Sequence, residues 1–250
     1  MKSFLFLLAI IISMNSILYA SYDDALELYK GKKYKESLNL IASELDIDKD
    51  MLPDSQNYEL RYLAAHNHWK LGNKQAAITH LKRCIDIQRN NINPLIDLSI
   101  LFTEIKRYGD ANYITKKALQ IEEHPIVYFL LGKIALYYRN YKRSKEYFEK
   151  SISLDPELSI SYNSLGIVLM RMKKYSQANT AFSAALAITP DSFEILNNIA
   201  LSLQKTGKYK EAIQYIKKAL IINPNNLIIK SNLKKMTINI GMKMEDEKKE

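Results

Sequence analysis

Residues with reactive side chains are few and scattered in this chain of 250 residues. Its four histidines are His66, His68, His80 and His124, and its single cysteine is Cys84. His66 and His68 are two residues apart, so on a helix they point to different faces and do not make a metal site. A single cysteine allows no disulfide within the chain and no zinc motif. We therefore expect no metal ion.

Motifs of known catalytic sites are missing from the sequence. It contains no P-loop, no G-x-G-x-x-G, no H-E-x-x-H and no G-x-S-x-G. We expect a protein that is not an enzyme and that uses no cofactor. An enzyme or ligand-binding protein of unrecognised type is the alternative, and a closed pocket with buried carboxylates or histidines would support it.

The formal net charge is +9, which would suit an acidic partner such as anionic lipid, an acidic protein or nucleic acid. The lysines, however, are spread in pairs such as Lys116–Lys117 and Lys217–Lys218 rather than massed in one run. This spacing favours lysines that coat the solvent faces of helices. We expect no nucleic-acid partner.

Residues 1–20 have the pattern of a signal peptide. Lys2 is followed by the apolar run Phe4–Met14, and Ala20 is a small residue at which cleavage could occur. The alternative is an uncleaved anchor, because the segment is near the lower limit for spanning a bilayer. We therefore expect export to the periplasm or cell envelope. If residues 1–20 are not cleaved, they anchor the protein in the inner membrane.

The rest of the chain is organised by an internal repeat. Residues 161–190 predict two short amphipathic helices joined by a tight turn, and Pro190 ends the second helix. Moved by 34 residues, the stretch recurs: Tyr175 meets Tyr209, Ala178 meets Ala212, Ala185 meets Ala219, Leu186 meets Leu220 and Pro190 meets Pro224. A period of this size predicts stacked helical pairs.

Small side chains recur where the two helices of a pair should cross. Closely packed helix axes tolerate only small residues at their nearest approach. In the first helix the position holds Ala25, Ala65, Ser99, Gly132, Gly166 and Ala200, and in the second it holds Ser37, Ala77, Ala111, Ser144, Ala178 and Ala212. Cys84 also falls at a position of small residues, so we expect a buried, inert thiol. The recurrent tyrosines at the turns, such as Tyr141 and Tyr175, are expected to pack between helices.

The Leu-Gly in the first helix, followed by Tyr, Ala, Phe, Ala and Pro, resembles the tetratricopeptide repeat (TPR) family. The resemblance implies an all-α, right-handed superhelical solenoid of about six helix-turn-helix repeats with a C-terminal capping helix. Repeats are expected at residues 21–46 (an irregular first repeat), 58–91, 92–124, 125–158, 159–192 and 193–226. A loop is expected at 47–57, the capping helix at 227–240 and a charged, frayed tail at 241–250.

In the TPR family the first helix of each repeat lines a concave groove, which implies a protein or peptide partner. By register the groove is lined by Tyr62, His66, Trp69, Lys70, Ile96, Ile100, Phe129, Lys133, Tyr137, Asn163, Ile167, Met170, Arg171, Asn197, Asn198, Leu201 and Lys205. Aromatic and apolar residues followed by Asn, Arg and Lys would suit an extended peptide or helix with some acidic character. Alternatively, several of these residues only pack against neighbouring repeats.

The sequence therefore predicts an exported, non-enzymatic scaffold that binds a protein or peptide in its groove. The alternative is a membrane-tethered assembly subunit that organises envelope proteins through a basic convex face. The lysine–asparagine–arginine clamp with which some TPR proteins hold a C-terminal carboxylate is not reproduced, so a chaperone-tail adaptor is not expected. The sequence leaves the partner and the oligomeric state open.

Overall fold

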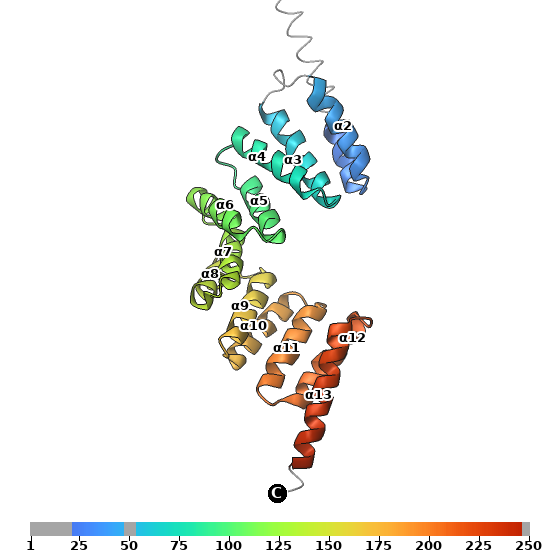
Figure 1. The fold of residues 1–250 in the computed structure, drawn as a ribbon, viewed down its shortest axis with the longest axis vertical. Helices are drawn as coiled ribbons and strands as arrows, with labels where there is room; N and C mark the ends of the chain where they lie inside the picture. The colour runs from blue at the N-terminus through green and yellow to red at the C-terminus, as the bar shows by residue number, and fades with distance from the viewer. Residues whose placement is uncertain (1–21, 48–53, 247–250) are drawn as a thin grey trace, which may run out of the picture. The chain divides into compact units, whose positions relative to one another are not determined.

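The computed structural model describes residues 22–47 and 54–246, and all its regular elements are helices (Figure 1). The chain divides into two compact units between Glu122 and Glu123. Unit 1 holds helical residues 22–30, then α2 (Tyr34–Ile47), α3 (Asp54–Lys70), α4 (Lys74–Ile87), α5 (Asn93–Glu104) and α6 (Tyr108–Ile121). Unit 2 holds α7 (Pro125–Tyr137), α8 (Tyr141–Leu154), α9 (Ser159–Arg171), α10 (Tyr175–Ile188), α11 (Phe193–Lys205), α12 (Tyr209–Ile222) and α13 (Leu227–Asp246).

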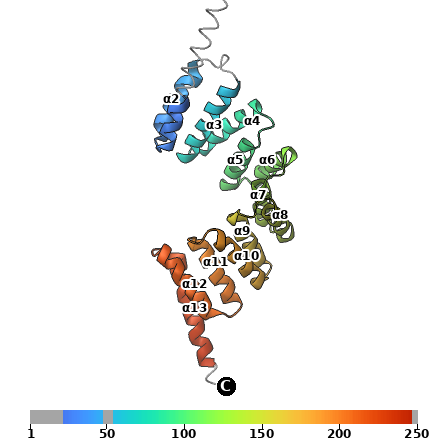
Figure 2. The same ribbon diagram turned by 180° about the vertical axis from the view of Figure 1, so that it is seen from behind.

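Each helix packs against the next one along the chain within its unit (Figure 2). We call the first helix of each pair (α3, α5, α7, α9, α11 and the cap α13) an A helix and the second (α2, α4, α6, α8, α10 and α12) a B helix. The predicted all-helical solenoid of helix pairs is confirmed, whereas its right-handed sense stays a prediction. The predicted signal peptide, residues 1–20, lies outside the described residues.

The same turn ends the first helix of every pair. One residue there has a positive φ between 58° and 80°: Lys32, Gly72, Lys106, Arg139, Lys173 and Gly207. The next N–H donates to the carbonyl five residues earlier, as from Lys174 to Leu169 at 2.9 Å. This Schellman geometry satisfies carbonyls that the helix itself leaves without partners. At the other end of the repeat, α8, α10 and α12 each stop two residues before a proline, as predicted.

All twelve predicted small residues at the helix crossings are buried. Where the residue is serine, its hydroxyl donates to the partner helix. Ser37 Oγ donates to the carbonyl of Ala25, and Ser144 Oγ donates to that of Gly132, each at 2.8 Å. Serine therefore serves as a small residue without leaving a buried polar atom unpaired.

The small residue on the A helix also contacts a larger side chain on the B helix, four positions after the small residue of that helix. The larger this second side chain is, the smaller is the residue on the A helix. Gly132 faces Phe148 and Gly166 faces Phe182, and a Cβ atom on either glycine would lie 2.6 or 2.4 Å from the ring. At the equivalent positions of the first, second and sixth repeats an alanine goes with an aliphatic residue: Ala25 with Ile41, Ala65 with Leu81 and Ala200 with Ile216. In these five repeats the space at the crossing is thus filled either by a ring or by a methyl group and an aliphatic side chain. The third repeat differs, because Ser99 goes with Thr115 and their hydroxyls form a hydrogen bond.

Two predicted boundaries are wrong. α3 begins at Asp54, inside the segment predicted as a loop at 47–57, because an aspartate is favoured in the first turn of a helix. α13 runs to Asp246, so residues 241–246 of the predicted frayed tail are helical. Lys234 on α13 is exposed, as expected of a cap that does not bury its small-residue position.

The size matching predicts the outcome of a double substitution. Gly166→Ala should destabilise the protein by about 1 to 3 kcal/mol, because its methyl group overlaps the Phe182 ring. Phe182→Ile should also destabilise it, through a cavity. The double variant reproduces the pair found at Ala200 and Ile216, so it should be more stable than either single variant. Urea unfolding followed by circular dichroism measures all three.

Gly109→Ala is the matched control, because nothing lies within 4 Å of a Cβ added at this helical glycine. That variant should be as stable as the parent chain or more stable. If the two single substitutions at residues 166 and 182 simply add in the double variant, the size-matching explanation is wrong.

Candidate functional site

The exposed side of the A helices is the candidate site in each unit. In unit 2, α7 contacts α9, α9 contacts α11 and α11 contacts α13. Stacked helix pairs curve toward the side on which alternate helices approach each other, so the A helices of unit 2 lie on its inner face. In unit 1, side-chain hydrogen bonds join α3 to α5 across the same side.

In unit 1 two predicted groove residues, Tyr62 and His66, contact the partly buried carboxylate of Asp97. Tyr62 Oη donates to Asp97 Oδ2 at 2.6 Å, and His66 Nε2 lies 3.1 Å from the same oxygen. Burial, followed by the negative charge of Asp97, raises the pKa of Tyr62, so its hydroxyl stays a donor. The Tyr62 and His66 rings meet edge to face with centroids 4.7 Å apart.

A second carboxylate, that of Glu104, lies seven residues after Asp97 on α5. Trp69 Nε1 donates to Glu104 Oε2 at 3.2 Å, and Lys74 Nζ lies 2.9 Å from that oxygen. The Trp69 ring stacks on His66 with centroids 6.1 Å apart. The inner side of unit 1 is therefore an aromatic strip edged by carboxylates that already have donors.

In unit 2 the same repeat positions hold asparagines. Asn198 Nδ2 donates to Asn163 Oδ1 at 3.0 Å, and Asn232 Nδ2 donates to Asn197 Oδ1 at 2.9 Å. Each pair is 35 residues apart, as are Tyr62 and Asp97. These bonds link consecutive A helices, so the asparagines also stabilise the stacking of repeats. Each amide keeps further donor and acceptor capacity for a ligand.

Two arginines and two tyrosines line a cavity of about 330 Å³ in unit 2. Its lining consists of Leu136, Tyr137, Arg139, Tyr141, Ile167 and Arg171. Tyr137, Ile167 and Arg171 are predicted groove residues that the structure brings together. Within the described part of the chain, neither arginine forms an ion pair with a carboxylate. Guanidinium groups that lie beside tyrosines suit a carboxylate ligand.

The other predicted groove residues differ in exposure. Lys70, Lys133 and Lys205 are exposed, whereas Ile96 is buried. Phe129 is 7% exposed and packs against Phe148 with ring centroids 5.9 Å apart. Met170, Leu201 and Ile167 are half-buried against the core of unit 2, and Ile100 is half-buried in unit 1. For the buried members, packing against neighbours accounts for the position.

Sequence reasoning missed the groups with which the predicted residues interact. Asp97 and Glu104 are seven residues apart, so a helix places them on one face, and that spacing could have identified them. Arg139 was missed because it stands in the turn rather than on an A helix. Asn232 was missed because the groove was not extended onto the cap helix α13.

The histidines His68 and His80 form a stacked pair between α3 and α4, with ring centroids 5.4 Å apart. Nδ1 of each ring is buried and lacks a hydrogen-bond partner among the described residues. Burial, with smaller contributions from His68 and Arg61, lowers the pKa of His80 to about 4. Burial also lowers the pKa of His68. Both rings are therefore neutral in the folded protein near neutral pH.

Cys84 is fully buried on α4, and burial raises the pKa of its thiol to about 12. Thiolate is the reactive form of cysteine, so this thiol is inert in the folded state. The expectation from the sequence is confirmed.

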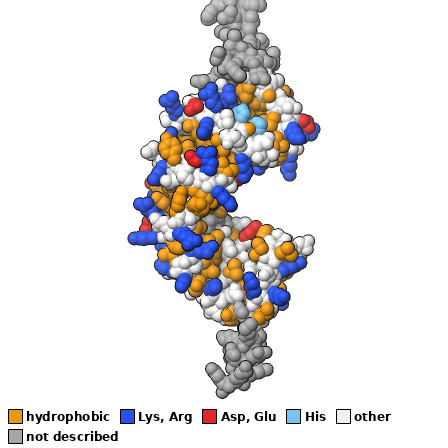
Figure 3. Space-filling model, viewed as in Figure 1, with side chains coloured by type: hydrophobic (Ala, Val, Ile, Leu, Met, Phe, Trp, Pro, Cys, Tyr) orange, Lys and Arg blue, Asp and Glu red, His pale blue; other side chains and the backbone are white. Residues whose placement is uncertain are grey.

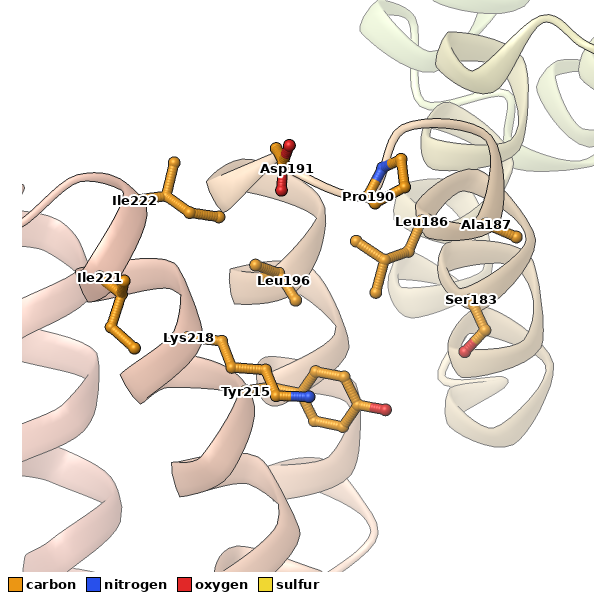
Figure 4. Close-up of a pocket in the computed structure, with 10 residues that line it drawn as sticks. All are labelled: Ser183, Leu186, Ala187, Pro190, Asp191, Leu196, Tyr215, Lys218, Ile221 and Ile222. Atoms are coloured by element: carbon orange, nitrogen blue, oxygen red, sulfur yellow. The ribbon is translucent and has the colours of Figure 1, made fainter.

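A second cavity lies on the B-helix side of unit 2 and measures about 660 Å³ (Figure 4). It is lined by Ser183, Leu186 and Ala187 of α10, Pro190 and Asp191 of the following turn, Leu196 of α11, and Tyr215, Lys218, Ile221 and Ile222 of α12. The cavity is mainly apolar, and its lining carries one lysine and one aspartate. No sequence prediction included it.

Lysine and arginine side chains are scattered over the visible face of the molecule (Figure 3). This agrees with lysines that coat the solvent faces of helices. Among the helices described, none is long and apolar enough to cross a membrane.

The sequence profile of the tetratricopeptide repeat family matches residues 58–91, 126–158 and 193–226. A TPR repeat-containing protein of Methanocaldococcus jannaschii is 33% identical over 152 residues, which cover 56% of this chain and 25% of that protein. The chain thus spans about a quarter of the length of this curated relative.

Solved structures share the fold. PilF of Pseudomonas aeruginosa has a TM-score of 0.73 and 16% identity, covering 90% of this chain and 98% of that one. YrrB, described as a TPR protein with an unusual peptide-binding site, has a TM-score of 0.56 and 14% identity over 78% of this chain and 97% of its own. At these identities the likeness shows the fold alone.

The histidine pair predicts how stability depends on pH. The pKa of His80 falls from an ordinary 6.5 to about 4 on folding, so below pH 6.5 the unfolded chain binds a proton that the folded chain does not. The free energy of unfolding should therefore be unaffected above pH 6.5 and should fall progressively from pH 6.5 to 4. In His80→Leu this fall should be smaller. Urea midpoints at pH 7.5, 6, 5 and 4.5 measure it.

Thr79→Leu is the control, because it makes the same change to leucine at an exposed position of α4 that carries no ionisable group. That variant should keep the pH slope of the parent chain. An unchanged slope in His80→Leu would show that other groups cause the acid sensitivity.

Proposed function

We propose, on the premise that this chain is a tetratricopeptide-repeat protein, that it is a non-enzymatic scaffold whose A helices bind an extended segment of a partner protein. Tetratricopeptide repeats act as protein-interaction scaffolds, and their architecture leaves one side of the A helices exposed. The peptide-binding site of YrrB, a TPR protein of similar fold, supports a peptide ligand.

The observation that carries the proposal is the inner face of unit 2. The asparagine pairs lie on the same A-helix side as the cavity that Arg139 and Arg171 line. An extended peptide presents backbone N–H and C=O groups, which asparagine amides can bind. An acidic side chain of that peptide would then reach the two guanidinium groups, which have the fork geometry that carboxylates prefer.

The two units differ in the ligand charge that they favour. Unit 2 offers Arg139, Arg171 and the exposed Lys205, so it suits an acidic segment. Unit 1 offers aromatic rings beside Asp97 and Glu104, so it suits an aromatic or apolar side chain and disfavours an acidic one. The acidic preference that the sequence predicts for the whole groove is therefore proposed for unit 2 only.

Binding of acidic peptides tests this proposal. A phage-displayed library of random twelve-residue peptides is selected on the full chain, and the affinities of the selected peptides are measured by fluorescence anisotropy. We expect acidic residues to be enriched. The variant Arg139→Gln with Arg171→Gln should weaken binding at least tenfold, because it removes both charge-assisted partners while keeping side-chain length.

The control is Lys142→Gln with Arg143→Gln, which removes two exposed cations from the B helix α8. It should leave the affinity within about twofold. Equal losses in both double variants would mean that net charge rather than the inner face binds the peptides, and selection of peptides without acidic residues would also contradict the proposal.

We further propose that the scaffold is exported, because residues 1–20 have the pattern of a signal peptide. Mass spectrometry of the protein isolated from cell envelopes should then find Ser21 as the first residue. If Met1 is retained and the protein sediments with membranes, the membrane-tethered assembly subunit that acts through a basic convex face becomes the better hypothesis.

A further inference from the structure

The turn between α12 and α13 exposes a cluster of aliphatic side chains. Ile221 is 81% exposed, Leu227 is 78% exposed and Ile228 is 70% exposed. Ile222 beside them is 41% exposed. We call these four residues the aliphatic tip. Large aliphatic side chains this exposed within one stretch of eight residues indicate a surface that has a partner.

A further repeat stacked on α13 would not cover the centre of the tip. Counted by the 34-residue period, Ile221 corresponds to Ala187 and Ile228 corresponds to Glu194. Ala187 and Glu194 are exposed although they lie inside the array of unit 2. These two repeat positions therefore face solvent even when repeats are stacked on both sides, so a further repeat would leave Ile221 and Ile228 exposed.

The chain around the aliphatic tip is strongly basic. Residues 212–244 contain no aspartate or glutamate, and their lysines are Lys217, Lys218, Lys230, Lys234, Lys235 and Lys243. The first five are exposed. The acidic residues of the neighbouring turn, Asp191 and Glu194, are fewer than these lysines. Aliphatic side chains that are flanked by exposed lysines match a partner that is apolar inside and negatively charged at its surface.

The cavity on the B-helix side adjoins the tip. Ile221 and Ile222 form part of its wall, and Lys218 lies beside Tyr215 at its edge (Figure 4). Its apolar lining and its volume of about 660 Å³ suit an aliphatic chain with an anionic end near Lys218.

We propose that the aliphatic tip docks the protein on an anionic lipid bilayer. The aliphatic side chains would enter the boundary between headgroups and acyl chains, and the lysines would reach anionic headgroups while their stems stay in the apolar layer. A protein partner would need an apolar surface shaped to four protruding side chains, whereas a bilayer adapts to them. This docking is peripheral.

The test reports on the tip itself, because residues 1–20 could bind membranes independently. Cys84 is buried and its pKa is about 12, so a cysteine placed at residue 228 is the only thiol that a dye labels in the folded full chain. Ile228→Cys carries a polarity-sensitive fluorophore, and Ile160→Cys is the matched control at the equivalent exposed position of α9. The probes are vesicles of phosphatidylcholine alone and with 30% phosphatidylglycerol.

With anionic vesicles we expect a blue shift and at least a twofold rise in emission at residue 228, and no change at residue 160. Lys217→Gln, Lys218→Gln and Lys230→Gln in the labelled chain should reduce the response several-fold, as should high salt. Neutral vesicles should give little response.

Three results would overturn the proposal. One is no change at residue 228 with anionic vesicles. Another is an equal change at residues 228 and 160, which would place the contact elsewhere, for example at residues 1–20. The third is a blue shift at residue 228 that grows with protein concentration without lipid, which would make a second copy of the chain the occupant.

Discussion

The close approach of the two helices in each repeat is the constraint on which the structure depends. Helices that cross with small residues in contact bring their backbones together, and the space that remains has one size. Gly132 and Gly166 leave room for a phenylalanine ring, whereas Ala200 goes with Ile216. These repeats therefore differ in sequence and keep one geometry, because the combined volume of the two side chains is preserved rather than the volume of either one. The third repeat is the exception, since Ser99 and Thr115 meet there through a hydrogen bond.

This constraint assigns one side of each A helix to packing and leaves the other side to carry chemistry. The bonds between consecutive A helices show this division. Tyr62 with Asp97 and Asn163 with Asn198 occupy the same repeat positions and span the same 35 residues. One geometry thus accepts an aromatic hydroxyl with a carboxylate in unit 1 and two amides in unit 2. The units can differ in ligand preference without any change in how their helices stack.

The fold was predictable from the sequence because its signals are local and repeated. The small residues at the crossings recur in every repeat, and Pro156, Pro190 and Pro224 follow the B helices at intervals of 34 residues. The site was predictable only in part. The side chains that interact with the predicted groove residues stand at repeat positions that the groove prediction did not include. Asp97 receives bonds from Tyr62 and His66 of the preceding repeat, and Arg139 enters its cavity from a turn. The positive φ that Arg139 adopts in this turn is a feature of the backbone, and the sequence does not reveal it.

The cap helix α13 carries both buried apolar residues, which hold it in the fold, and exposed apolar residues, which do not. Ile229 and Met236 are buried in the core of unit 2, and Asn232 bonds to Asn197 on the inner face. These contacts are sufficient to hold the helix in place. Leu227 and Ile228 precede Ile229 directly, yet they remain exposed. Their side chains thus bury little surface, and exposed aliphatic clusters promote association. Their aliphatic character therefore needs a cause other than packing, and a partner surface is such a cause.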